Sequence, residues 1–135
     1  MRENYFDHEA DIGIIGRGKT INDCFVDAAH VMFSMMTDLS KIQPKKTLAF
    51  TFEESDIELA FVTWLNLLLA HANAKNLIFS QFNISQQGDQ WQGEASGEPW
   101  RDDMERGTDV KGATLTMLSV KKINDEWEAR CVVDV

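Results

Sequence analysis

The sequence predicts an α+β protein, a two-layer sandwich in which two helices cover one face of a mainly antiparallel sheet of about six strands. Two segments repeat apolar residues at the spacing of an amphipathic helix. The other apolar residues alternate with polar ones, as in half-buried strands. Because 135 residues suit one hydrophobic core better than two, we expect a single domain over residues 1–135.

The first expected elements are a strand at residues 12–15 and a partner strand at residues 4–6. Residues 13–20 also match the nucleotide-binding pattern G-x-x-x-x-G-K-[ST]. A P-loop directly follows a hydrophobic strand, but the residues before Gly13 are polar. Ile14 and its neighbour would also stand inside the phosphate cradle. We therefore interpret this segment as a strand, a glycine turn and the start of a helix.

Residues 20–37 predict the first helix, because Thr20 and Asp23 resemble a capping box ahead of apolar residues at helical spacing. Residues 55–74 predict the second helix, with Ser55 as its N-cap. Its apolar residues extend beyond one face, so we expect it to be largely buried. Its apolar run is too short to span a bilayer, and no membrane association is expected.

The remaining segments read as strands and one loop. Residues 46–52 predict a strand, and residues 78–85 and 90–97 predict a hairpin around Gly88. A second hairpin is expected from residues 110–123 and 126–134, around Asn124-Asp125. The pattern-free residues 98–107 predict an exposed loop, a kind of segment that often carries function.

Composition narrows the classes of function. The formal net charge is −9, and such an acidic protein repels phosphate backbones, which argues against direct nucleic-acid binding. It suits a basic protein partner or a bound cation. Cys24 and Cys131 lie far apart in apolar patterns and are expected to be free thiols in a reducing compartment. The N-terminal residues lack a signal-peptide pattern, so a cytoplasmic location is expected.

Carboxylates are the best candidates for chemistry. His8, His30 and His71 lack zinc-site spacing. Strand alternation places Asp134 on the face opposite Trp127, and Asp11 is out of phase with its apolar neighbours. Two aspartates at strand ends could meet and bind a hard cation such as Ca²⁺ or Mg²⁺. On the pattern alone, solvated surface carboxylates are the simpler interpretation.

Short segments along the whole chain resemble, in order, those of the archease family. They are His8-Glu9-Ala10-Asp11-Ile12-Gly13, Met36-Thr37-Asp38, Trp64-Leu65-Asn66-Leu67-Leu68, Phe79-Ser80, Gly97-Glu98-Pro99, Thr108-Asp109-Val110-Lys111-Gly112-Ala113-Thr114, Trp127-Glu128-Ala129-Arg130 and Val133-Asp134-Val135. No single motif is highly specific, and the shared order carries the resemblance.

The resemblance implies a non-enzymatic accessory protein of RtcB-type RNA ligases, which join 3′-phosphate or 2′,3′-cyclic phosphate RNA ends to 5′-hydroxyl ends, as in tRNA splicing. Archeases promote the guanylylated ligase and multiple turnover. The family's functional aspartates fall on Asp11 and Asp134, with Asp38 as a further candidate ligand of Ca²⁺, Mg²⁺ or Mn²⁺. The family's lysine falls on Lys111, as a residue for partner activation.

Two family histidines are missing, because Met104 lies near one of these positions and Thr116 stands at the other. This difference indicates a divergent member whose partner surface has changed. Two alternatives stay open. One is a small metal-dependent hydrolase or nucleotide-handling enzyme that uses the same aspartates or the glycine loop. The other is a chaperone-like protein-binding module, suggested by the methionines of the first helix.

Overall fold

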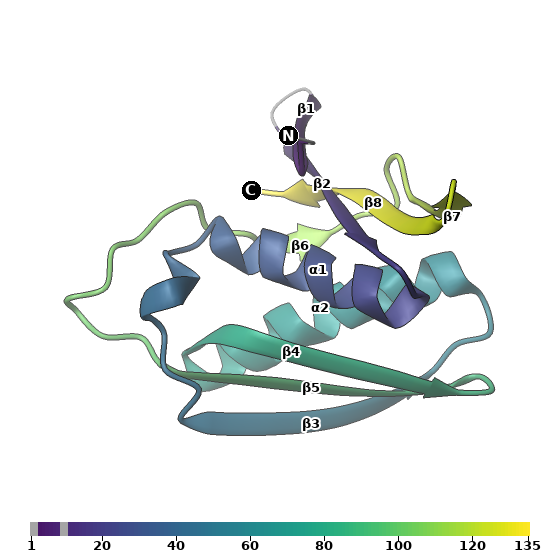
Figure 1. Cartoon of the computed structure of the whole chain (residues 1–135). Coiled ribbons are helices and arrows are strands. Elements are labelled where there is room, and N and C mark those ends of the chain that lie inside the picture. The colour runs from purple at the N-terminus through teal and green to yellow at the C-terminus, as the bar shows by residue number, and fades with distance from the viewer. Residues whose placement is uncertain (1–2, 9–10) are drawn as a thin grey trace.

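Two antiparallel sheets enclose two helices in the computed structural model, which describes residues 3–8 and 11–135 (Figure 1). Sheet A contains β1 (Tyr5–His8), β2 (Asp11–Gly18), β6 (Gly112–Ala113), β7 (Ser119–Ile123) and β8 (Glu126–Asp134). Sheet B contains β3 (Lys46–Glu53), β4 (Leu77–Gln87) and β5 (Gln90–Pro99). The helices are α1 (Ile21–Ser34) and α2 (Ile57–Lys75), and a short 3-10 helix, η1, covers Leu39–Lys41. Met1, Arg2, Glu9 and Ala10, the last two within the N-terminal motif, lie outside the described residues.

The α+β class, the two helices and the antiparallel pairing are confirmed, while the strands form two sheets in place of one. Figure 1 shows the helices between sheet A above and sheet B below. On one side, the backbone and side chain of Ala28 in α1 leave no room for a Cβ at Gly16 of β2. On the other side, the rings of Phe33 in α1 and Phe79 in β4 lie 5.7 Å apart. The helix layer therefore supplies core to both sheets.

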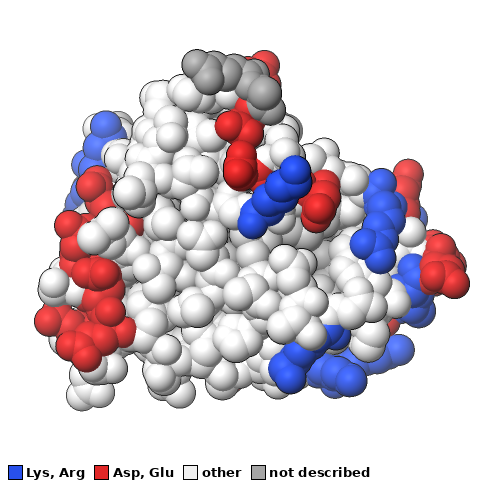
Figure 2. All heavy atoms as spheres, turned by 180° about the vertical axis from the view of Figure 1, so that it is seen from behind, with Lys and Arg blue, Asp and Glu red and all other residues white. Residues whose placement is uncertain are grey.

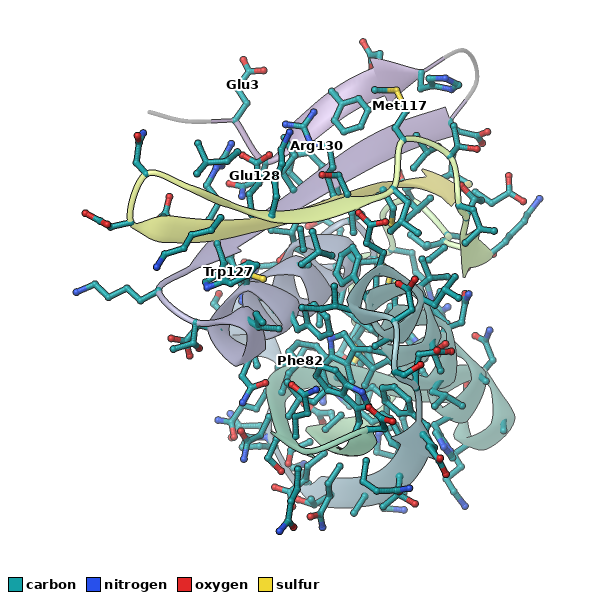
Figure 3. All side chains as sticks on the ribbon, turned by 90° about the vertical axis from the view of Figure 1, so that its right-hand side faces the viewer. Glu3, Phe82, Met117, Trp127, Glu128 and Arg130 are labelled. Atoms are coloured by element: carbon teal, nitrogen blue, oxygen red, sulfur yellow. The ribbon has the colours of Figure 1, made fainter. Side chains whose placement is uncertain are left out.

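Sheet A has the order β1-β2-β8-β6, with β7 also paired to β8. Its inner face includes Ile14 and Cys131, which pair in register and are fully buried. Figure 3 shows Glu128 and Arg130 on the side of β8 away from the helices, and Trp127 on the helix side. The alternation predicted for the last strand is confirmed.

The segment that matches the P-loop pattern is a strand. β2 pairs with β8 without interruption from Ile12–Val133 to Gly18–Trp127. Backbone groups that belong to an antiparallel ladder cannot also fold around phosphates. The hydroxyl of Thr20 then accepts a hydrogen bond from the N–H of Asp23, at 3.0 Å, and begins α1. The predicted strand and N-cap are confirmed, while the predicted glycine turn is wrong, because Gly16 and Gly18 lie in β2 and the chain bends at Lys19 and Thr20.

Both helices differ from expectation at one end. α1 ends at Ser34, three residues before the predicted end, because the carbonyls of Met35 and Met36 accept bonds from a distant loop. α2 is capped by Asp56, and the prediction of Ser55 was wrong. The Asp56 carboxylate accepts from the N–H of Glu58 at 2.8 Å and of the next residue at 3.1 Å.

α2 is the core helix of the fold. Its length and composition would also suit a membrane span, but much of the helix is buried between the two sheets. Its buried residues are Ala60, Phe61, Val62, Trp64, Leu65, Leu68, Leu69 and Ala72. The prediction that this helix is buried beyond one narrow face is confirmed at these residues, while the apolar Leu59 of the same helix is 40% exposed.

The predicted strand at residues 110–123 is broken, which corrects the sequence interpretation. β6 contains two residues and β7 begins at Ser119. Between them the chain turns, with a backbone bond from Leu118 N–H to the Leu115 carbonyl and a positive φ of 55° at Met117. The turn exposes Leu115 (63%) and Met117 (50%) at the edge of sheet A. Alternating polarity alone could not reveal this local reversal.

Candidate functional site

Asp11 and Asp134 lie on neighbouring strands at one end of sheet A. Ile12 pairs with Val133, so Asp11 lies one position beyond this pair, at the level of Asp134. Their out-of-phase positions place both side chains on the outer face of the sheet. His8 pairs with Asp11 at this end of the sheet. The structure thus brings together two carboxylates that are far apart in the sequence.

Lys111 also lies at this end of the sheet. Its N–H donates to the backbone carbonyl of Asp134 at 2.7 Å, and the next residue, Gly112, pairs with Asp134 in β6. Both Lys111 and Asp134 are exposed, while Asp11 is half-buried. Solvent and a protein partner can therefore reach Lys111 and the two carboxylates. We call Asp11 and Asp134 the carboxylate pair from here on.

Asp38 occupies a different place. Its carboxylate caps η1 by accepting from the N–H of Ser40 at 3.1 Å and from its hydroxyl at 2.7 Å. These hydrogen bonds, first that of the hydroxyl, hold the pKa of Asp38 below its usual value. No contact with Asp11 or Asp134 is seen within residues 3–8 and 11–135, so the local role of Asp38 is to cap η1.

The carboxylate pair supplies two hard oxygen donors, which is the donor chemistry that Ca²⁺, Mg²⁺ and Mn²⁺ prefer. Within the part of the chain that the structure describes, no three His, Cys, Asp or Glu side chains gather as a complete metal cage would require. Ca²⁺ takes roughly six to eight oxygen ligands. Asp11 and Asp134 therefore fit part of a cation site, with the other ligands coming from backbone, water or a partner.

The two positions at which the resemblance implies histidines, Met104 and Thr116, have separate surroundings. Met104 is half-buried against the core, and its sulfur accepts from the N–H of Arg101 at 3.3 Å. Thr116 is exposed, and its carbonyl accepts from the N–H of Val132 at 3.0 Å, two residues from Asp134. An apolar anchor thus occupies the first of these positions, and a small hydroxyl occupies the second.

Glu98 is a buried carboxylate that the sequence interpretation placed in an exposed loop, and that placement was wrong. Its side chain is 2% exposed, accepts from the N–H of Gln43 at 2.7 Å, and pairs with Arg101 and with Lys45 at 3.7 Å. The Gln43 N–H is the main reason why the pKa of Glu98 is lowered. Glu98 thus joins the end of β5 to the segment before β3 and to the loop that follows.

The lowered pKa of Glu98 predicts a pH-dependent stability. A carboxylate with a lowered pKa in the folded state stabilises the fold above its unfolded pKa, about 4.3, and this contribution is lost as pH falls through the folded value. Glu98→Gln should therefore lower the Tm most near neutral pH, and the difference from wild type should shrink at pH 3. Thermal unfolding between pH 3 and 7 measures this.

The exposed Glu94 of β5 offers a matched control for Glu98. Glu94→Gln should change the Tm little at any pH, because an exposed carboxylate contributes little to stability. If the loss caused by Glu98→Gln were equally large at pH 3 and pH 7, ionised Glu98 would not be the stabilising species.

Comparison with known proteins points to one family over nearly the whole chain. The family model described as the Archease protein family matches residues 4–135. The curated protein archease of Sulfolobus acidocaldarius is 34% identical over 137 residues, covering 99% of both chains. That of Sulfurisphaera tokodaii is 32% identical over 134 residues, covering 97% of this chain and 96% of its own.

Solved structures share the fold. The solution structure of Methanobacterium thermoautotrophicum protein 1598 has a TM-score of 0.86 at 28% identity, covering 98% of this chain and 97% of that one. The crystal structure of a Thermotoga maritima archease, described as a possible chaperone, has a TM-score of 0.67 at 18% identity, covering 100% and 98% of the two chains. At that lower identity the Thermotoga structure supports the fold alone.

Proposed function

The chain belongs to the archease family, and from this premise we propose that it is a non-enzymatic activator of an RtcB-type RNA ligase in tRNA splicing or RNA repair. The observation that carries the proposal is the placement of Asp11 and Asp134 on neighbouring strands beside Lys111. These residues come from both ends of the chain, and the exposed Lys111 and Asp134 with the half-buried Asp11 form a surface suited to a partner. The proposal places the protein in the cytoplasm.

The carboxylate pair contributes by holding a divalent cation at the partner's surface. Asp11 and Asp134 would bind it with their carboxylate oxygens, and its charge would offset the repulsion between them. Two carboxylates leave coordination positions free, and oxygen or nitrogen groups of the ligase can fill these. Lys111 adds a positive charge at the same edge, which suits contact with an anionic group of the partner or its nucleotide.

If the protein activates the ligase by favouring one of its conformations, this chain needs no catalytic group. The protein would bind one ligase conformation better than another and so raise the fraction ready for guanylylation and repeated turnover. The thiols of Cys24 and Cys131 are poor candidate nucleophiles, because burial raises the pKa of each to about 12. The regular pairing of β2 likewise gives no support to a nucleotide-handling enzyme.

The test is multiple-turnover joining of a 3′-phosphate RNA to a 5′-hydroxyl RNA by the ligase of the same organism, with GTP. The wild-type protein should stimulate joining and should join no RNA alone. Asp11→Ala/Asp134→Ala should remove most of the stimulation, by a factor of roughly 10 or more, as expected for loss of a coupling of a few kcal/mol. Lys111→Ala should also reduce it.

Asp125→Ala provides the matched control, because Asp125 is an exposed acid at the β7–β8 turn of the same sheet. It should stimulate as the wild type does. Circular dichroism and the Tm should show that each variant is folded. Full stimulation of joining by the folded double variant, or no stimulation by the wild-type protein, would contradict the proposal.

Cation binding is measured separately, by calorimetric titration with Ca²⁺, Mg²⁺ and Mn²⁺. The double variant should lose the binding of the wild-type protein. Asp38→Ala decides whether the third candidate aspartate contributes, and we expect binding to persist because Asp38 already caps η1. Unchanged binding by the double variant would show that the cation binds elsewhere. The ligase assay would still test activation independently of cation binding.

A chaperone-like role is the second candidate, favoured by the exposed Leu115 and Met117 on the turn between β6 and β7. Two large apolar side chains on an exposed turn can contact an apolar partner surface. A general chaperone would suppress aggregation of unrelated unfolding proteins and would lose this activity in Leu115→Ser/Met117→Ser. A dedicated ligase activator would not suppress such aggregation.

A further inference from the structure

A pocket lies between the C-terminal end of α2 and the loop of residues 100–109, which Figure 1 shows running from β5 past the end of α1. Its volume is about 310 Å³, near the lower end of small-ligand sites. The apolar side chains that line it are Met36, Leu69, Leu77 and Trp100, and its charged residues are Arg106 and Asp109. None of these residues belongs to the carboxylate pair.

Arg106 gives the pocket a cation. Its guanidinium lies over the ring of Trp100, 3.8 Å from the ring centroid. Among residues 3–8 and 11–135, no carboxylate forms an ion pair with Arg106. A stacked guanidinium keeps its N–H groups at its edge, where two of them can bind a carboxylate in parallel.

The chain around the pocket is held in place from both sides. The N–H groups of Gly107 and Thr108 donate to the backbone carbonyls of Met36 and Met35 at 2.7 and 2.8 Å, and the Thr37 hydroxyl donates to the backbone carbonyl of Glu105 at 2.6 Å. At the other end, the N–H of Trp100 donates to the carbonyl of Asn76 at 3.1 Å, just past α2. Arg106 and Trp100 are therefore positioned before any ligand arrives, which lowers the entropic cost of binding.

Charged side chains of both signs lie at this end of the molecule. Figure 2 shows acidic side chains gathered on its left flank, while the opposite flank carries basic and acidic side chains side by side. α2 begins beside Glu58 and ends with Lys75, and Lys45 pairs with Glu98 near the base of the loop. The loop itself carries the exposed Asp102, Asp103, Glu105 and Asp109 beside Arg101 and Arg106, so the guanidinium of Arg106, and not a general positive field, would hold an anion at the pocket.

We propose that this pocket binds a small carboxylate that carries an apolar or aromatic group. The carboxylate would pair with Arg106, and the apolar group would lie against Trp100, Leu69 and Leu77. The negative charge of Asp109 favours a singly charged ligand over a doubly charged one. Its repulsion of a doubly charged phosphate would be twice its repulsion of a carboxylate at the same distance. A free organic acid and the C-terminal residue of a peptide share this chemistry.

Calorimetric titration with three probes tests the proposal: N-acetyl-L-phenylalanine, its amide, and N-acetyl-Gly-Gly-Phe with a free carboxylate. The acid should bind and the amide should bind about 10-fold more weakly or not at all, as expected for loss of a charged hydrogen bond. Tighter binding of the tripeptide identifies a peptide C-terminus as the source, and equal binding identifies a free acid. Phenyl phosphate should bind more weakly than the acid.

Variants separate the pocket from general charge effects. Arg106→Gln should weaken binding of the acid about 10-fold, Arg106→Lys should weaken it less, and Asp109→Asn should strengthen it. Lys121→Gln removes one positive charge from the exposed face of β7 and should leave binding unchanged. No binding of any probe, equal binding of acid and amide, tighter binding of the phosphate, or full binding by folded Arg106→Gln would overturn the proposal.

Discussion

Gly97→Ala is expected to prevent stable folding at 25 °C. A Cβ at Gly97 would lie 1.9 Å from the carbonyl oxygen of Ile78 and 2.8 Å from the Cα of Phe79. These are backbone atoms of the neighbouring strand, so a change of rotamer cannot relieve the clash. The pairing of β4 and β5 also shifts register at this place, between Phe79 and Gln81. The bulged backbone of β4 therefore lies directly against Gly97, the residue of β5 that has no side chain.

The expected cost is on the order of 4–5 kcal/mol or more, since the strands must separate to accept the methyl group. This is comparable to the whole stability of many domains of this size, about 5–15 kcal/mol. Urea unfolding of the purified variant, or its loss to the insoluble fraction on expression, measures the effect. Damage should also reach Glu98, the next residue, whose carboxylate joins three segments.

Two other glycines serve as controls. At Gly112 a Cβ would lie 3.6 Å from the Asn66 side chain, an ordinary contact, so Gly112→Ala should be nearly neutral. At Gly88 the space is open but φ is +61°, so Gly88→Ala should cost roughly 1–2 kcal/mol through backbone strain alone. A Gly97→Ala protein as stable as the Gly112→Ala protein would show that β4 and β5 can move apart cheaply.

Trp64→Ala is expected to lower the free energy of unfolding by roughly 3–5 kcal/mol. Trp64 is fully buried in α2, and its ring lies 5.8 Å from that of Phe50 in sheet B. Its indole N–H donates to the backbone carbonyl of Phe25 in α1 at 2.9 Å. The one side chain thus joins both helices and a sheet, and its removal leaves a large cavity where the layers meet.

Trp64→Phe separates the hydrogen bond from the packing. It keeps most of the aromatic volume and loses the N–H, so a smaller cost of about 1–3 kcal/mol is expected. Urea unfolding monitored by far-UV circular dichroism compares the two variants. If both variants lost the same free energy, the hydrogen bond to Phe25 would dominate and the packing argument would be wrong.

Local features of the fold follow from the sequence because their causes lie within a few residues. Thr20 caps α1 because its hydroxyl reaches a backbone N–H three residues ahead. The β4–β5 turn follows from Gly88, which adopts a positive φ, and the alternation along β8 separates Trp127 from Glu128. The same local reasoning failed at Ser55, because the carboxylate of its neighbour Asp56 reaches two N–H groups at the helix start.

Long-range pairing decided the division of strands into two sheets. Alternation shows that a segment is half-buried and carries no information about which strand lies beside it. The burial of Glu98 likewise depends on Gln43 and Lys45, which come from another part of the chain. Arg106 and Trp100 looked like residues of an ordinary exposed loop, and the pocket exists because that loop binds the ends of both helices.

The candidate site shows both contributions. Strand alternation and the family motifs identified Asp11, Asp134 and Lys111, since side-chain direction and residue identity are properties of the sequence. That Asp11 and Asp134 lie at the same level of sheet A was decided by the register of β2 against β8, between residues more than 100 positions apart. Asp38 belonged to the same sequence-based set, yet the fold gave it a cap on η1, because its nearest hydrogen-bond donors are those of Ser40.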